Sequence, residues 1–288
     1  MAAALTDFDL DETGKIDLNG IYDQPDPRDY YQTIHRLDYR IPAAAEPVFR
    51  AVIATMRAVR RVQRLTVLDV GCSYGVNAAI LKYGCDLSDL FALYDPDTDP
   101  GSRRAVLSRD QAFFGRRTAD DDLTVVGLDT AGRALSYARE SGLLSATIAT
   151  DLEARPPTED EAATLTGVDL ILSTGAIGYV GAPTFEHILR QCRTKPWLAL
   201  FALRMFPIDD IAGVLKRRGY AVFRLAGQTF RQRRFAGADE ARKVRDNLAD
   251  LGIDPTGRES EGWYHADFYF AHPSDETVPA PISRLVQI

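Results

Sequence analysis

The spacing of apolar residues changes near residue 65 and divides the chain into two parts. After this point, short apolar runs alternate with segments in which apolar residues recur every three or four positions. The runs are LTVLDV, LTVVGLD, SATIATDL, VDLILSTG and WLALFALRMF. Such alternation predicts strand–helix–strand units around a parallel sheet that helices cover on both faces.

The end of the chain departs from this rhythm. Two further strand-like stretches, YAVFRLAGQTFRQRRF and GWYHADFYF, flank the helical segment ADEARKVRDNLADLG. The pattern predicts two long strands, the second of which returns antiparallel at a sheet edge. The basic run of the first stretch, Arg231, Arg233 and Arg234, is interpreted as a solvated face of that strand.

Before residue 65 the pattern is helical. Residues 1 to 28 carry Asp, Gly and Pro at short intervals, which predicts an extended or partly disordered lead-in. The stretches DYYQTIHRLDYR and PVFRAVIATMRAVRR then predict two amphipathic helices on either side of Ile41 and Pro42. We therefore expect an N-terminal extended segment and helical lid over residues 1–62, followed by one main domain over residues 63–288.

One stretch of the main domain is too long for an ordinary connection. A loop between a helix and the next strand usually has about 2 to 6 residues, whereas roughly 30 extra residues lie within 82–122. They include the turn-forming DPDTDPG and the helical SRRAVLSRDQAFFGRR. We expect an ordered insertion at the ligand-binding edge of the sheet, and a surface elaboration without functional contact is the alternative.

Composition narrows the class of protein. The 288 residues carry a formal net charge of −7, which disfavours a protein that binds nucleic acid through clustered Lys and Arg. Three cysteines form no Cys-x-x-Cys pair and no histidine stands at metal-ligand spacing, so neither a disulfide framework nor a metal site is expected. The N-terminus lacks a signal-peptide layout, and no apolar run approaches the ~20 residues that span a bilayer. We expect a cytoplasmic protein without membrane or nucleic-acid partners.

The strongest local motif follows the first strand of the main domain. The strand VLDV runs into Gly71-Cys72-Ser73-Tyr74-Gly75, and the helical segment NAAILKYG follows. Glycines in such a turn let backbone N–H groups approach a ligand closely at the carboxyl end of the strand. A dinucleotide fingerprint would place glycine at 71, 73 and 76, but the chain has Ser73 and Val76. An NAD site is therefore disfavoured, while a tight turn in another α/β protein stays open.

Acidic residues follow the next two strands. Asp129 stands at the carboxyl end of the second strand, where a carboxylate can accept hydrogen bonds from both hydroxyls of a ribose. Asp151 ends the third strand, where it can accept a bond from an adenine amino group while Leu152 packs on the ring. Asp129 can instead cap the following helix, and Asp151 can be a turn residue. Both interpretations remain open for each residue.

The stretches VLDVGCSYG, GLDTAGRALSYAR, ATDLE and VDLILSTGAIGYVG resemble the successive motifs of class I S-adenosylmethionine (SAM) dependent methyltransferases, over residues 65–205. The resemblance implies SAM as the cofactor and an α/β fold with a Rossmann-like, seven-stranded, mostly parallel sheet whose last strand is antiparallel. It places the methionine at the glycine turn, the ribose at Asp129, the adenine at Asp151, and the sulfonium at the end of the fourth strand. The cofactor residues that it implies are Asp69, Gly71, Cys72, Ser73, Gly75, Asn77, Asp129, Thr130, Asp151, Leu152, Thr174 and Gly175. Ser73 departs from the family, which usually has its middle glycine there.

An aromatic set lies on the N-terminal helical part, at Tyr30, Tyr31 and Tyr39. If this part covers the cleft, one of the rings, taken as Tyr31, contacts the cofactor, because a cation over an aromatic face gains ~0.5–2 kcal/mol. The alternative is that the rings only pack the helix on the sheet. A contact with the cofactor would make the helical part a lid.

Methyl transfer needs mainly in-line placement of the acceptor, and a general base only for acceptors that arrive protonated. Tyr179 and His265 are the candidate catalytic bases, with His35 as a further one, although each can equally be structural. We expect a methyltransferase with a small-molecule substrate, and a homodimer is an open option. The alternatives are an enzyme that cyclises or cleaves SAM and releases methylthioadenosine, and a non-catalytic SAM-binding protein.

Overall fold

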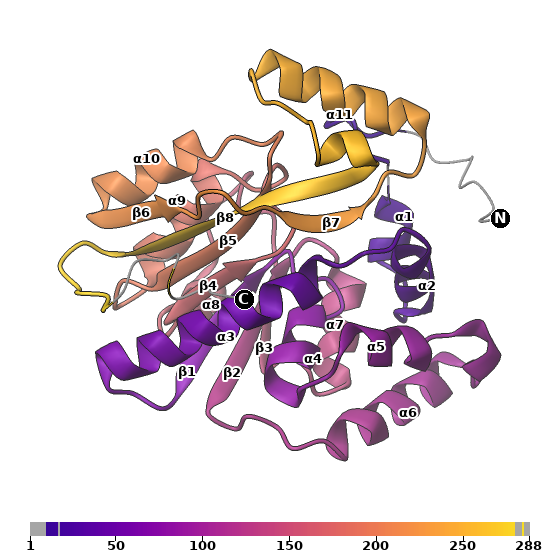
Figure 1. Cartoon of the computed structure of the whole chain (residues 1–288). Helices are drawn as coiled ribbons and strands as arrows, with labels where there is room; N and C mark the ends of the chain where they lie inside the picture. The colour runs from indigo at the N-terminus through magenta and orange to yellow at the C-terminus, as the bar shows by residue number, and fades with distance from the viewer. Residues whose placement is uncertain (1–9, 17, 280–283, 285–288) are drawn as a thin grey trace.

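The described strands form one mixed sheet in the order β3-β2-β1-β4-β5-β8-β6, with β7 also paired to β8 (Figure 1). The structure is a computed structural model that describes residues 10–16, 18–279 and 284. The strands are β1 (Leu65–Val70), β2 (Leu123–Asp129), β3 (Ala146–Ala149), β4 (Leu170–Ser173), β5 (Trp197–Leu203), β6 (Tyr220–Arg224), β7 (Phe230–Arg234) and β8 (Trp263–Pro273). Strands β1 to β5 are parallel, and β8 is antiparallel to its neighbours. The predicted α/β fold with a Rossmann-like, mostly parallel sheet and an antiparallel last strand is confirmed.

The sheet has one strand more than the seven expected. The stretch predicted as a single long strand after residue 219 is divided into β6 and β7, because Gly227 takes a φ of +80° that interrupts the extended backbone. Strand β8 is long enough to pair with both pieces on the same edge, β7 near its start and β6 near its end. The split turns β7 toward the N-terminal part of the chain (Figure 1).

Helices cover the sheet on both faces. They are α1 (Asn19–Tyr22), α2 (Arg28–Arg36), α3 (Ile41–Arg60), α4 (Val76–Tyr83), α5 (Leu87–Leu93), α6 (Arg103–Gly115), α7 (Gly132–Glu140), α8 (Glu159–Leu165), α9 (Ala182–Gln191), α10 (Asp209–Arg217) and α11 (Ala238–Asp250). Short 3-10 helices are η1 (Pro96–Thr98) and η2 (Glu259–Glu261). Among the described residues, no helix is both long and apolar enough to cross a membrane.

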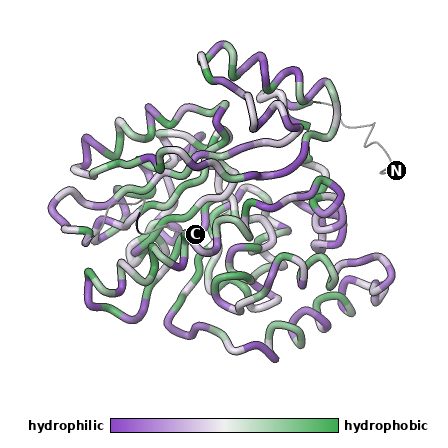
Figure 2. Tube along the Cα trace, in the orientation of Figure 1, coloured by the Kyte–Doolittle hydropathy of each residue, from purple (hydrophilic) through white to green (hydrophobic). Residues whose placement is uncertain are grey.

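Two apolar clusters lie on the two faces of the sheet, one on each face. Helices α3, α4 and α7 share one cluster with one side of the strands, and α8, α9 and α10 share the second cluster with the other side. Neighbouring strand residues alternate between them, as Val67 and Leu68 do, because successive side chains point to opposite faces. Figure 2 shows hydrophobic positions gathered in the sheet. The strand order reverses between β1 and β4, and α/β sheets bind ligands beside such a reversal.

The N-terminal part is more ordered than the predicted lead-in. Residues 1–9 and 17 lie outside the described residues, but Leu10 and Ile16 form an antiparallel bridge, and α1 and α2 follow. Helix α3 begins at Ile41 with Pro42 in its first turn, where the missing N–H of proline breaks no helical hydrogen bond. Its buried side chains pack on the face of the sheet that also carries α4.

Candidate functional site

A cavity of about 460 Å³ opens at the carboxyl ends of the parallel strands. The strand ends and the turns after them contribute Val70, Gly71, Ser73, Leu128, Asp129, Thr130, Ala131, Thr150, Asp151, Leu152, Thr174, Gly175 and Ala176. Further walls come from the N-terminal residues 11–39 and from β7. The volume is that of a small-molecule site. Its position is the edge at which α/β folds bind ligands.

The turn after β1 has a backbone that favours glycine. Gly71 has a φ of +74°, and a Cβ placed on it would lie only 2.4 Å from the Cβ of Ala176. Ser73 also takes a left-handed conformation, with a φ of +48°, which is uncommon for a residue with a side chain. The serine thus follows the backbone path expected of a glycine at this position. Its hydroxyl is buried and has no hydrogen-bond partner within the described chain.

Asp129 joins this turn to the end of β2. Its Oδ2 accepts a bond from the Ser73 amide at 2.8 Å, and its Oδ1 accepts one from the Ala131 amide at 3.0 Å. Asp151 also binds backbone, because its Oδ1 accepts a bond from the Glu153 amide at 2.9 Å. Both carboxylates nevertheless line the cavity. Capping of a turn and contact with a ligand are therefore compatible at each of them.

Asp69 and Asn77 lie behind the cavity wall and do not line it. The Asn77 Nδ2 donates to Asp69 Oδ1 at 3.0 Å and to Thr174 Oγ1 at 3.2 Å, and Thr174 does line the cavity. Burial raises the pKa of Asp69 to about 7, the bond from Asn77 opposes this rise, and the charge of Asp129 adds to it. The two residues are placed to support the end of β4.

Two other predicted cofactor residues also stay out of the cavity walls. Cys72 points into the interior, where a Cβ placed on Gly127 would lie 2.6 Å from its Sγ. Gly75 is the residue that precedes α4, with a φ of +81°. Both shape the turn without facing the space that it encloses.

Residues 10–16, here called the strap, pass over the cavity and connect two of its walls. Tyr179 follows β4 in the chain, and its hydroxyl donates to Asp11 Oδ2 at 2.6 Å. At the other end, the Ile16 amide donates to Glu240 Oε1 of α11 at 2.7 Å. Asp11 and Lys15 of the strap line the cavity. Nothing in the local sequence pattern indicated this arrangement, because both anchors lie far along the chain.

The aromatic residues of the N-terminal part divide between cavity and core. Tyr30 and Tyr39 line the cavity together with Tyr22, whereas Tyr31, the ring predicted to contact the cofactor, does not. Tyr31 stacks on Tyr94 of the inserted segment, with ring centroids 4.3 Å apart and nearly parallel planes. The ring of Tyr31 is therefore taken up by packing against the inserted segment.

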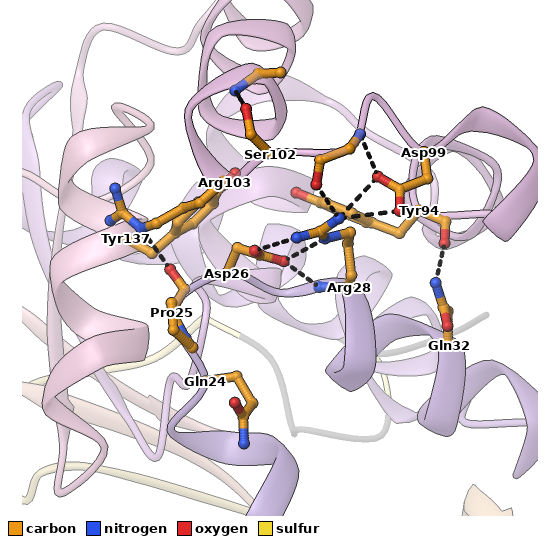
Figure 3. Close-up of polar contacts among 12 residues, drawn as sticks. Gln24, Pro25, Asp26, Arg28, Gln32, Tyr94, Asp99, Ser102, Arg103 and Tyr137 are labelled. Atoms are coloured by element: carbon orange, nitrogen blue, oxygen red, sulfur yellow. Dashed lines mark hydrogen bonds and ion pairs between the residues drawn. The ribbon is translucent and has the colours of Figure 1, made fainter.

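The insertion at 82–122 is ordered and supports the N-terminal part from outside. All of these residues are described, and none lines the cavity. Figure 3 shows Arg28 between two segments: its guanidinium pairs with Asp26 and, at 2.8 Å, with Asp99 of the insertion. Arg103 donates to the Pro25 carbonyl at 2.8 Å. The insertion therefore contributes to the site indirectly, by holding residues 25–28.

The two candidate catalytic bases differ in their position relative to the cavity. His265 lies outside the cavity, with its Nδ1 2.9 Å from the Thr229 hydroxyl, and burial together with the charge of Arg231 lowers its pKa to about 4. Tyr179 lines the cavity, but burial and the carboxylate of Asp11 raise the pKa of its hydroxyl above the ordinary value. The phenol therefore stays protonated at neutral pH.

Strand β7 contributes residues that sequence reasoning missed. Its pairing with β8 shifts register between Arg231 and Arg234, so that Gln232 and Arg233 are both buried and both line the cavity. Such a bulge re-aims side chains locally and is invisible in the alternation of the sequence. Arg233, predicted to be solvated, donates to both oxygens of Glu240 at 2.9 and 2.7 Å.

The chain is similar to several solved structures at low sequence identity. No family model and no curated protein sequence matches it. The TehB-like SAM-dependent methyltransferase from Corynebacterium glutamicum is 15% identical, with 86% of this chain and 98% of that chain covered and a TM-score of 0.42. The plantazolicin methyltransferase BpumL in complex with S-adenosylhomocysteine (SAH) is 11% identical, with 88% of this chain and 93% of that chain covered and a TM-score of 0.43. The [4+2]-cyclase SpnF is 12% identical, with 77% of this chain and 80% of that chain covered and a TM-score of 0.37.

One fold hosts many functions, so the fold alone does not decide what the chain does. The described part of the chain has the strand order β3-β2-β1-β4-β5-β8-β6, an antiparallel β8, and a cavity at the carboxyl ends of the parallel strands. The chain has the Rossmann-like α/β fold that its motifs predicted.

Proposed function

We propose that the chain is a SAM-dependent methyltransferase that acts on a small molecule. The observation that carries the proposal is the hydrogen bond from the Ser73 amide to Asp129, which joins the turn after β1 to the acid after β2 in one wall. Thr174 and Gly175, at the end of β4, line the same cavity. The resemblance assigns the methionine, the ribose and the sulfonium of SAM to these three positions.

The groups in this wall fit such a cofactor. Each oxygen of Asp129 accepts one backbone bond, so lone pairs remain for two ribose hydroxyls. The hydroxyl of Ser73 is buried without a partner in the described chain, and a buried polar group of this kind calls for a ligand or water. Leu152 offers a buried apolar side chain beside Asp151, as an adenine ring requires.

The remaining chemistry asks little of the chain. Bound SAM supplies a methyl group on a sulfonium, which is already a good leaving group. The residues of the chain need to hold the acceptor in line and to exclude water. The strap and the rings of Tyr22, Tyr30 and Tyr39 are placed to do both. Because Tyr179 stays protonated and His265 lies elsewhere, we propose an acceptor whose nucleophile needs no base from these two residues.

Binding of SAH tests the cofactor assignment. We expect calorimetry to show micromolar affinity, and a thermal shift at ~100 times the dissociation constant, where binding adds about 2.7 kcal/mol to the stability of the folded state. Asp129→Asn should weaken SAH about tenfold or more, because charge-assisted bonds to the ribose are lost. Asp121→Asn, at an exposed position away from the cavity, is the matched control. A shift with NAD and none with SAH would refute the assignment.

Incubation with SAM alone separates the proposal from the alternatives. A methyltransferase leaves SAM largely intact until an acceptor is added, and then forms SAH. Catalytic release of methylthioadenosine without an acceptor would instead identify an enzyme that cyclises or cleaves SAM. Tight binding of SAH with no turnover on any acceptor tested would favour a SAM-binding protein without catalysis.

A further inference from the structure

The proposed function puts the methyl acceptor in the half of the cavity that is lined by residues outside the proposed cofactor set. Its walls come from the strap, from Tyr22, Tyr30 and Tyr39, from the segment around Tyr179, and from β7. These walls combine aromatic surface with a small number of charged groups. The contacts of each charged group show which group remains free to bind a ligand.

Most charged groups of this half are already engaged within the protein. Asp11 accepts bonds from the Thr13 amide at 2.9 Å, from the Thr13 hydroxyl at 2.6 Å, from the Lys15 amide at 3.1 Å and from the hydroxyl of Tyr179. Although burial raises the pKa of Asp11, these bonds hold it below its ordinary value. The carboxylate thus stays ionised and shapes the strap.

Arg233 is engaged in the same way. Its guanidinium forms a two-pronged pair with Glu240, and Glu240 also accepts bonds from the Ile16 amide and, at 2.7 Å, from the Ala236 amide. Both members of the pair are buried. The charge of the arginine is therefore neutralised locally, and the pair anchors the strap to α11.

Lys15 is different. Its side chain lines the cavity and the residue is only 8% exposed, yet no described residue forms a hydrogen bond or an ion pair with its ammonium group. The ammonium group lies over the ring of Tyr179, whose centroid is 4.7 Å from Nζ. Burial, followed by the charge of Arg233, lowers the pKa of Lys15 to about 8, while the charges of Asp11 and Glu240 oppose this change, so the amine is still largely charged at pH 7. A buried cation without a directly bonded counter-ion is costly, and an anionic ligand would reduce that cost.

Gln232 is a second group that awaits a partner. It is buried and lines the cavity, and its Oε1 has no hydrogen-bond donor among the described residues. Its Nε2 would lie 3.0 Å from a Cβ placed on Gly175, which puts the amide beside the end of β4. An O–H or N–H group of a ligand would satisfy the free oxygen there.

Resting on the proposed methyltransferase function, we infer that the acceptor is a small carboxylic acid that also carries an O–H or N–H group. The carboxylate of this acid pairs with Lys15, and its polar hydrogen is accepted by Gln232. The aromatic walls favour a flat or apolar body between the two groups. A carboxylate suits the cavity better than a doubly charged phosphate. Only one unpaired cation is present in the described wall, and four carboxylates of the protein line the same cavity, at Asp11, Asp23, Asp129 and Asp151, which disfavours a second negative charge on the ligand.

The test compares acids with matched amides on the SAH-loaded protein. The probes are 3-(4-hydroxyphenyl)propanoate with its amide and 4-hydroxybenzoate with its amide, and calorimetry measures their dissociation constants. We expect an acid to bind about tenfold or more tightly than its amide, because the amide cannot form the charged pair. Lys15→Met should remove this preference. Lys243→Met deletes the same charge from an exposed position next to the strap and should preserve it.

Several outcomes would overturn the inference while the proposed function stands. They are SAH binding without measurable binding of any acid, equal affinity for acids and amides, and an acid preference that persists in Lys15→Met. Weaker SAH binding in Lys15→Met would also overturn it, by assigning the lysine to the carboxylate of the cofactor. Absence of SAH binding to the unaltered protein is the distinct result that refutes the proposed function itself.

Discussion

The carboxyl group of Asp69 is expected to make the protein less stable as pH rises, and asparagine at this position should remove the effect. Burial raises the pKa of Asp69 to about 7, while the bond from Asn77 opposes the rise and the charge of Asp129 adds to it. In the unfolded chain the same carboxyl titrates near its ordinary value of 3.8. Between the two values the folded protein holds a proton that the unfolded chain releases.

The sign and size of the effect follow from this difference in bound protons. Because the folded state binds more protons between pH 4 and 7, the free energy of unfolding falls as pH rises through this window. The two pKa values differ by about 3, which at ~1.4 kcal/mol for each pH unit corresponds to a loss on the order of 4 kcal/mol. The stabilisation is complete below pH about 4, where both states are protonated, and is lost above pH about 7.

Urea unfolding of the wild type and of Asp69→Asn, at several values between pH 4 and 8, measures the effect. Subtracting one curve from the other cancels the titrating groups that do not interact with Asp69, so the difference should grow in favour of the variant with rising pH. The bond from the Asn77 amide can be kept, since asparagine retains a carbonyl oxygen. A difference that stays constant within about 1 kcal/mol over this range would show that the reasoning about the buried carboxyl is wrong.

Three further predictions concern other parts of the site. Gly71→Ala should destabilise the protein by on the order of 2–3 kcal/mol in urea unfolding, because its Cβ meets Ala176 and its φ is positive; an effect below about 0.5 kcal/mol would contradict the close approach. His265→Gln should leave SAH affinity and turnover unchanged within about twofold, since the ring lies outside the cavity, and a loss of turnover alone would restore a catalytic role. Arg233→Met should cost about 3–5 kcal/mol by leaving Glu240 buried without its partner, and the double variant with Glu240→Gln should recover part of that loss; an unchanged melting temperature in the single variant would refute the buried pair.

The parts of the fold and site that the sequence predicted rest on short-range signals. The turn from Gly71 to Gly75 and the acids at Asp129 and Asp151 follow directly from a strand that ends and a helix that begins, so their neighbours in the chain reveal them. Parallel strands then bring these positions to one edge without further information. The alternation of strands and helices likewise predicted the α/β class and the antiparallel last strand.

The cavity walls that come from the strap, from the N-terminal tyrosines and from β7 could not be predicted in this way. It depends on contacts between distant residues, such as the bond from Ile16 to Glu240, which are separated by 224 positions. The choice of Tyr30 over Tyr31 as a wall residue depends on Tyr94 in the insertion, because the ring that finds a stacking partner leaves the cavity. Arg233 became buried through a shift in strand register. Tertiary packing, which local pattern does not encode, decided all three.

Strand β8 has a consequence for how the protein is made. It is the last strand of the described chain, yet it lies within the sheet, between β5 on one side and β6 and β7 on the other. Translation delivers residues in order, so these three strands leave the ribosome before their common partner exists. Their open edges are templates for association with other nascent chains until residues 263–273 arrive. Premature termination before Trp263 would therefore yield an aggregating fragment instead of a smaller folded protein.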